Sequence, residues 1–235
     1  MRKNVDGTRA VLRRRAARRW RIVACSLLAA AATAQAQPQG NDYYQARSTK
    51  EGRSLLSRVE GYHLEQGVGK MHAGRYSYAY ADFDFILRYF PNHPRGLALF
   101  AELCDVKWKN PRCDTEARLK NAIEINPRAP QTFIVYGMHL QRLNRVPEAI
   151  ESYKRAAVLN PASAAAHYNL GLIYLEQKQF ELANRHAQLA YSIGMPYPGL
   201  RDKLTQAGQW KPMDADEIKR ELVPPDDVKP AAPPT

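Results

Sequence analysis

The sequence predicts an all-α fold, a solenoid of about four helix-turn-helix repeats with capping helices at both ends. One reason is self-similarity at a spacing of 34 residues, since Asn126-Pro127 recurs as Asn160-Pro161. A second is that apolar residues between these marks recur with helical spacing. A third is composition. With 45% hydrophobic and 25% charged residues among 235, the chain is neither wholly disordered nor a polytopic membrane protein.

The first 36 residues have the pattern of a cleaved secretory signal peptide. A basic block, Arg13–Arg21, precedes an apolar run, Ile22–Thr33, and the small-residue site Ala34-Gln35-Ala36 follows. We expect cleavage after Ala36. The apolar run is shorter than the roughly 20 residues that a membrane-spanning helix needs. The pattern therefore predicts an exported protein, periplasmic or secreted, with no stable membrane span after cleavage.

The charge of the chain is concentrated in this leader. Of 35 basic and 23 acidic residues, nine basic and one acidic residue precede position 37. The remainder holds 26 basic and 22 acidic residues, a net charge of +4 against +12 for the whole chain. A nucleic-acid-binding surface needs a basic stripe, so we expect no nucleic acid partner.

The repeats are expected between residues 60 and 196, after a linker and an N-terminal helix at 37–60. Their predicted bounds are 60–93, 96–129, 130–163 and 164–197. The last two are in strict register, with Gly137 recurring as Gly171 and Ala149 as Ala183. The first two are looser, because Leu103 stands where the second repeat should carry glycine.

The third and fourth repeats share one order of large, small and proline positions. The fourth reads His167-x-x-Leu170-Gly171-x-x-Tyr174, then Ala183-x-x-x-Ala187-x-x-Ala190, and closes at Pro196. This order resembles the tetratricopeptide repeat (TPR), a 34-residue helix-turn-helix unit. The resemblance implies that the small residues let paired helices approach closely. It also implies that at least three units must stack to bury their apolar faces.

The array is expected to end in capping helices at 198–222 and a tail at 223–235. Leu200 and Leu204 lie on one face of a predicted helix that begins near Pro198 and stops at Gly208. Asp214 can cap a further short helix. The remaining segment is rich in proline and is predicted to be disordered.

Two cysteines remain after the expected cleavage, Cys104 and Cys113. In an oxidising compartment this pair, nine residues apart, is a candidate disulfide, with two buried reduced thiols as the alternative. Two thiols without neighbouring ligands are too few for a zinc site, so no metal is expected.

No catalytic motif is present in the sequence. There is no phosphate loop, dinucleotide fingerprint or nucleophile elbow, and the six histidines are scattered. Asp82 and Asp84 flank Phe83 in a predicted helix, where side chains two apart point in different directions. We therefore interpret them as a solvated face. The chain is expected to be no enzyme and to need no cofactor.

The TPR resemblance implies that the first helix of each repeat lines a concave groove for a protein or peptide partner. The residues expected to contact a partner there are Phe100, Trp108, Ile134, Met138, Arg142, Tyr168, Asn169 and Leu172. The expected function is a non-enzymatic scaffold or adaptor that binds an envelope protein. The alternative is a glycan-contacting accessory subunit of a polysaccharide or secretion system. Self-capping of the groove by the C-terminal helix stays open, as do the identity of the partner and the oligomeric state.

Overall fold

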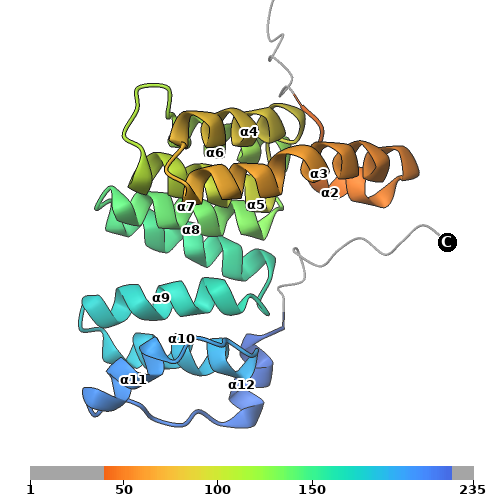
Figure 1. Ribbon diagram of the computed structural model, residues 1–235. Helices are drawn as coiled ribbons and strands as arrows, with labels where there is room; N and C mark the ends of the chain where they lie inside the picture. Colours follow the sequence, from red (N-terminus) through yellow and green to blue (C-terminus); the bar gives the residue numbers. More distant parts are fainter. Residues whose placement is uncertain (1–39, 224–235) are drawn as a thin grey trace, which may run out of the picture. The chain divides into compact units, whose positions relative to one another are not determined.

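A computed structural model of the chain describes residues 40–223, which fold into α-helices without any β-strand (Figure 1). The predicted all-α class is confirmed. The expected leader with its cleavage after Ala36 lies outside the described residues, as does the expected tail beyond Val223. Within the described part, none of the helices is both long enough and apolar enough to span a bilayer.

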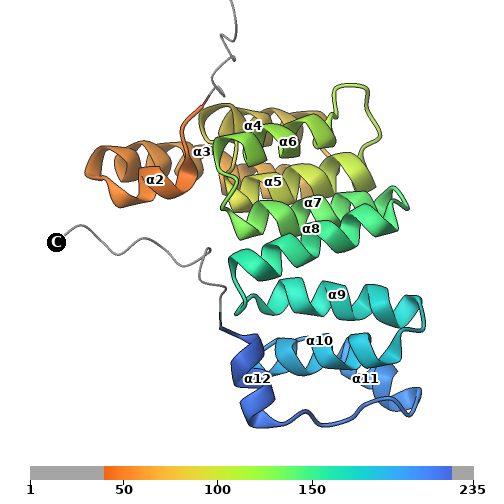
Figure 2. The same cartoon turned by 180° about the vertical axis from the view of Figure 1, so that it is seen from behind.

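Three pairs of consecutive helices pack closely and form three of the four expected repeats (Figures 1 and 2). They are α3 (Lys50–His72) with α4 (Tyr76–Tyr89), α7 (Pro130–Arg142) with α8 (Val146–Leu159), and α9 (Ala164–Glu176) with α10 (Phe180–Ser192). Helix α8 also packs on α9, which stacks the third repeat on the fourth. The helix-turn-helix solenoid predicted from the 34-residue period is thus the observed architecture.

Small residues allow the close approach within these pairs. A Cβ at Gly137 would lie 2.6 Å from Cε1 of Tyr153 in α8, and one at Gly67 would lie 2.5 Å from Cε1 of Phe83 in α4. Both aromatic side chains are fully buried. Any residue larger than glycine would have to displace an aromatic ring from the core. The glycine positions of the sequence pattern therefore mark the contact seam of each pair.

The second repeat departs from this pattern. It consists of α5 (Pro94–Ala101), the π-helical segment η1 (Glu102–Lys107) and, after a loop, α6 (Thr115–Ile125). Leu103 is fully buried at the position where the flanking repeats carry glycine. Its side chain fills the space through which paired helices approach elsewhere, and α6 packs on α7 more than on α5. A disulfide joins Cys104 in η1 to Cys113 before α6.

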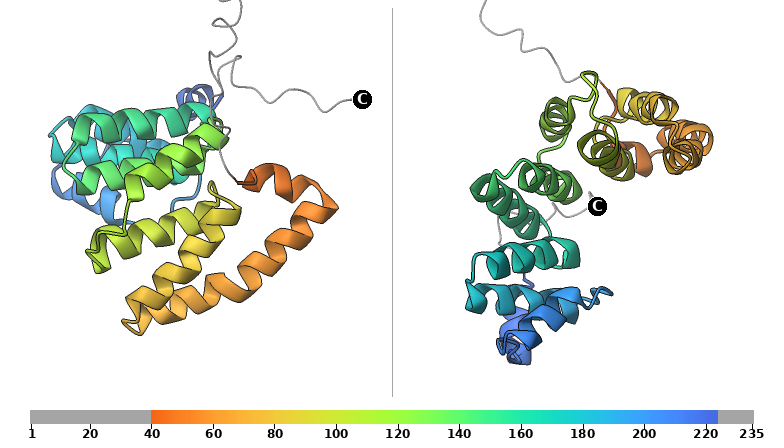
Figure 3. Two further views of the ribbon diagram at one scale, coloured as in Figure 1. Left: turned by 90° about the horizontal axis from the view of Figure 1, so that it is seen from above. Right: turned by 60° about the vertical axis from the view of Figure 1, so that its left-hand side comes forward.

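At the N-terminal end, the structure has no helix boundary at residue 60. Helix α3 runs without interruption from Lys50 to His72, so the expected N-terminal helix and the first helix of repeat one are a single element (Figure 3). A short helix, α2 (Tyr43–Ser48), precedes it and packs against it. Residue 60 lies inside this helix, and no proline interrupts the chain there.

Asp42 fixes helix α2 to the turns between repeats. Its Oδ1 accepts the backbone N–H of Tyr44 at 2.8 Å and the Nδ2 of Asn92 at 2.9 Å, and its Oδ2 accepts the Nδ2 of Asn126 at 2.9 Å. Asn92 precedes α5 and Asn126 precedes α7. One carboxylate therefore caps α2 and ties it to two successive repeat junctions.

The C-terminal end is covered by α11 (Gly199–Gln206), and α12 (Ala215–Glu221) packs against α10 (Figure 2). Leu200 and Leu204 of α11 are fully buried. The Cδ2 of Leu200 approaches to 2.5 Å of a Cβ built at Gly171, so this glycine admits the terminal helix. Asp214 caps α12 by accepting the backbone N–H groups of Asp216 and Glu217.

Candidate functional site

Four apolar side chains on the first helices of the third and fourth repeats form the candidate groove. Ile134 and Met138 lie on α7, and Tyr168 and Leu172 lie on α9. All four are only partly buried and pack on the margin of one core cluster, which includes Leu140, Tyr153 and Leu170. They are anchored by the core and still present apolar surface, as interface anchors do. These four are called the α7/α9 groove below, after the groove that the TPR resemblance implies, and their contact with a partner stays a prediction.

Segments from both ends of the described chain reach these two helices. The hydroxyl of Tyr44 in α2 donates to Oε1 of Gln131 in the first turn of α7, at 2.9 Å. The rings of Tyr168 and Tyr197 lie 6.3 Å apart, and a Cβ at Gly199 would lie 3.4 Å from the Tyr168 hydroxyl. The C-terminal contact thus comes from the segment before α11, whereas α12 lies against α10.

The two polar residues expected in the groove bind to the protein itself. The Nδ2 of Asn169 donates to the backbone carbonyl of Ala165 in the same helix, at 2.9 Å. Nη1 of Arg142 lies 3.3 Å from Oδ2 of Asp105. The polar groups of both residues are therefore already engaged within the protein.

Phe100 is fully buried and so has no surface for a partner, contrary to the sequence expectation, whereas Trp108 is partly exposed and its contact with a partner stays a prediction. Phe100 is fully buried between the ring of Tyr80, 5.5 Å away, and the guanidinium of Arg118, 5.7 Å from its own ring. The Trp108 ring lies 5.6 Å from that of Tyr80 and packs on the N-terminal core. The second repeat is irregular, and side chains of α4 and α6 enclose Phe100 there. The equivalent positions on α7 and α9, Ile134 and Tyr168, stay partly exposed.

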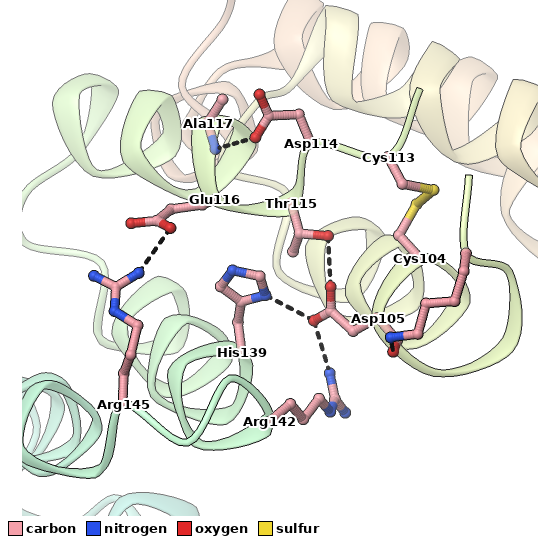
Figure 4. Close-up of polar contacts among 11 residues, drawn as sticks. Cys104, Asp105, Cys113, Asp114, Thr115, Glu116, Ala117, His139, Arg142 and Arg145 are labelled. Atoms are coloured by element: carbon pink, nitrogen blue, oxygen red, sulfur yellow. Dashed lines mark hydrogen bonds and ion pairs between the residues drawn. A yellow bond between two sulfur atoms is a disulfide. The ribbon is translucent and has the colours of Figure 1, made fainter. Parts of the chain in front are cut away.

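A buried polar cluster around Asp105 joins the second repeat to the third (Figure 4). The Asp105 carboxylate accepts hydrogen bonds from Nδ1 of His139 and Oγ1 of Thr115, both at 2.8 Å. Arg142 adds the ion pair described above. Burial alone would raise the pKa of Asp105, but the hydrogen bonds from His139 and Thr115 outweigh it and hold that pKa below its ordinary value.

The disulfide lies beside this cluster and helps to form it (Figure 4). Cys104 precedes Asp105, and Cys113 precedes Asp114, which caps α6 by accepting the backbone N–H of Ala117 at 2.9 Å. The covalent link therefore holds the start of α6, with Thr115, next to η1.

The chemistry of the Asp105 cluster is structural. Three donors already contact the Asp105 carboxylate. Nε2 of His139 is buried and has no hydrogen-bond partner among residues 40–223. Asp105 and His139 therefore present no accessible base to a substrate. In the same part of the chain, no group of three or more His, Cys, Asp or Glu side chains is placed to hold a metal ion.

Asp82 is also buried, which corrects its interpretation as part of a solvated face. Its carboxylate lies 3.0 Å from Nδ1 of His63 and 2.6 Å from Nζ of Lys70, both on α3. The spacing of side chains within one helix does not reveal partners on another helix. The partners come from the other helix of the pair, where Gly67 lets the Asp82 side chain approach.

Comparisons with known proteins agree with this architecture. Residues 141–178, from the end of α7 to the turn after α9, match the family described as TPR repeat. No curated protein matches the chain. A solved structure of PilF from Pseudomonas aeruginosa has a TM-score of 0.52 at 17% sequence identity, covering 75% of this chain and 79% of that chain. This likeness shows the fold alone. A crystal structure of MamA protein has a TM-score of 0.47 at 19% identity, covering 70% of this chain and 88% of that chain.

Proposed function

We propose that this chain is a non-enzymatic adaptor of the cell envelope, because residues 141–178 match the TPR repeat and the TPR fold serves as a scaffold for protein–protein interaction. It binds an envelope protein, or a peptide segment of one, in the α7/α9 groove. The observation that carries this proposal is that Ile134, Met138, Tyr168 and Leu172 rest on one core cluster while remaining partly exposed. Rigid backing and exposed apolar surface together suit the apolar face of a partner segment.

The proposed periplasmic location rests on the leader pattern and is supported by the disulfide. Disulfides form and persist in oxidising compartments. The test is fractionation of the cells, followed by N-terminal sequencing of the mature protein. Recovery in the periplasm with Gln37 as the first residue is expected. Recovery in the cytoplasm with an intact leader would refute the location.

The groove is tested with a photoreactive amino acid placed at Leu172, and at Leu182 as a control on the other helix of the same repeat. Leu182 is 39% exposed on α10. We expect Leu172 to capture a defined partner that Leu182 does not. Met138→Ala/Tyr168→Ala should abolish this capture while circular dichroism shows an intact fold. Equal capture from both positions, or no effect of the double substitution, would contradict the groove.

Sedimentation of the purified chain with polysaccharide distinguishes the glycan alternative from a protein partner. If the chain sediments with peptidoglycan or exopolysaccharide in the absence of other proteins, and Tyr168→Ala abolishes this, the aromatic residues contact sugar instead. With a protein partner as proposed, the purified chain stays in the supernatant.

A further inference from the structure

A second cleft lies at the N-terminal end of the repeats, away from the α7/α9 groove. Helices α2 and α3 and the start of α5 line an open cleft of about 680 Å³. Tyr43, Leu56, Leu64 and Pro94 supply its apolar lining. Leu56 and Leu64 are core residues with only 6% of their surface exposed, so this part of the cleft is fixed by the core beneath it. A cleft of this size can take a short segment of peptide.

Three arginines rim the cleft, and two of them have no acidic partner in the part of the chain that the structure describes. Arg95 pairs with Glu65 at 2.6 Å. Arg53 donates from Nη1 to the backbone carbonyl of Arg47 at 3.0 Å, and the guanidinium of Arg47 lies 5.6 Å from the centre of the Tyr43 ring. Among residues 40–223, no carboxylate forms an ion pair with Arg47 or Arg53. Two adjacent, exposed positive charges therefore stand beside an apolar lining.

The acidic residues of the cleft are already engaged. Glu65 is bound by Arg95, and Oε1 of Glu60 lies 2.7 Å from Nε2 of His93. Nδ1 of His93 accepts the backbone N–H of Gly96, so Nε2 carries the hydrogen that Glu60 accepts. His93 is then neutral and Glu60 keeps its negative charge, so the three arginines and two glutamates of the lining sum to +1. The excess positive charge lies at Arg47 and Arg53.

The wall that carries Arg47 is held rigidly. Helix α2 is attached through Asp42 to Asn92 and Asn126, and through Tyr44 to Gln131. The backbone N–H of Tyr43 also donates to Oδ1 of Asn92 at 2.8 Å. A preorganised wall lowers the entropy that a ligand must lose on binding. These hydrogen bonds thus hold the α2 wall of the cleft in place without a ligand.

From this arrangement we propose that the cleft binds an acidic peptide segment of a partner protein, one that carries apolar residues between its aspartates or glutamates. Arg47 and Arg53 bind its carboxylates, and Tyr43, Leu56 and Leu64 receive the apolar side chain. Charge complementarity selects the occupant, because paired guanidiniums favour carboxylates with bidentate geometry. Because the lining is also apolar, the cleft should bind such a peptide more tightly than a polyanion that is recognised by charge alone. This site is independent of the proposed α7/α9 groove.

The test uses the purified chain and a fluorescent hexapeptide with leucine at positions two and five and aspartate elsewhere. Two matched peptides replace aspartate by asparagine, or leucine by serine. We expect anisotropy titrations at low salt to show that the asparagine and serine peptides each bind about tenfold or more weakly. Arg47→Gln/Arg53→Gln should weaken the aspartate–leucine peptide by a similar factor.

The matched control is Arg58→Gln/Arg75→Gln, which removes two exposed arginines outside the cleft. It should change the dissociation constant by less than about twofold. Equal losses in both double variants, or equal binding of the three peptides, would overturn the proposal. Tighter binding of a hexathymidylate than of the peptide would also overturn it, in favour of a nucleic acid ligand. Melting curves of all variants exclude misfolding as the cause, and the α7/α9 variant Met138→Ala/Tyr168→Ala should bind the hexapeptide normally.

Discussion

Asp105 and His139 occupy the same position in consecutive repeats, and the structure places their side chains in contact at 2.8 Å. They are 34 residues apart, one full repeat. Asp84 and Arg118 also form an ion pair between stacked repeats, although they are not equivalent positions, because the first repeat is offset from the second by 36 residues (Gly67 against Leu103). In both pairs an acidic residue of one repeat meets a basic residue of the following repeat. These two contacts fasten the irregular second repeat to both of its neighbours.

Asp105→Asn should destabilise the fold by about 1.5–3 kcal/mol, the range for hydrogen bonds to charged groups. The amide keeps the shape of the side chain but loses the charge that His139 and Arg142 contact. Urea denaturation at pH 7 measures the loss, with Asp202→Asn on the exposed face of α11 as the control. An unchanged midpoint for Asp105→Asn would contradict the prediction.

The pH dependence of that difference follows from the lowered pKa of Asp105. A carboxyl group whose pKa is depressed in the folded state stabilises it above the ordinary pKa, and the stabilisation is lost as pH falls through the lower, folded-state pKa. The difference between the original chain and Asp105→Asn should therefore be complete above pH 3.8, the ordinary value, and shrink at more acidic pH. A difference that persists unchanged at the lowest accessible pH would refute the ionic origin.

The fold could be predicted because its determinants repeat. Gly137 and Gly171 stand at seams that admit no side chain, and their spacing is visible in the sequence. Leu103 at the glycine position indicated that the second repeat is irregular, but it did not indicate which irregular structure forms there. The π-helical segment η1 depends on packing between distant segments, which has no local signature. The continuity of α3 has a local basis, because no proline interrupts residues 50–72.

The exposure of the expected contact residues could be predicted only where the repeats are regular. Ile134 and Tyr168 are equivalent positions and both side chains are partly exposed. The equivalent Phe100 is instead enclosed by Tyr80 and Arg118. Asp105 was missed because each repeat was considered alone. The comparison of charges 34 residues apart would have found both the Asp105–His139 and the Asp84–Arg118 contacts. The cleft beside α2 had no sequence signal, since its wall comes from outside the repeats.

Gly137→Ala and Gly61→Ala should change stability in opposite directions. A Cβ at Gly137 would meet the buried Tyr153 ring at 2.6 Å, so overpacking should cost about 1–2 kcal/mol net. At Gly61, in the middle of α3, nothing lies within 4 Å of a built Cβ. Alanine there should stabilise by about 0.5–1 kcal/mol, because it lowers the entropy of the unfolded chain. Thermal and urea denaturation compare the two, and changes of the same sign would contradict the assignment of Gly137 to the seam.

Reduction of the Cys104–Cys113 disulfide should lower the free energy of unfolding by about 2–3 kcal/mol, as expected for a short closed loop. The link holds η1 against the start of α6, where Thr115 reaches Asp105. Denaturation with and without dithiothreitol measures the effect. Cys104→Ala/Cys113→Ala should be indifferent to the reductant, and an equal response of both proteins would show that the disulfide is not the cause.

His167 and His186 should make the fourth repeat sensitive to acid. Nε2 of His167 donates to the carbonyl of Pro161 at 2.8 Å, so its Nδ1 is free to accept from Nδ1 of His186 at 3.1 Å. A proton on Nδ1 of His167 would set two donors against each other. Burial, and then the charge of His167, lower the pKa of His186 to about 3.

The unfolded chain binds this proton near pH 6.5 and the folded chain does not, so stability falls as pH drops below 6.5, by about 1.4 kcal/mol per pH unit for one histidine. His186→Phe keeps the ring that stacks on Tyr174 but removes the proton. Its loss of stability between pH 6.5 and 4.5 should be about 2 kcal/mol smaller than that of the original chain. His72→Phe, at an exposed position of α3, is the control. If both variants keep the pH dependence of the original chain, the histidine pair does not cause it.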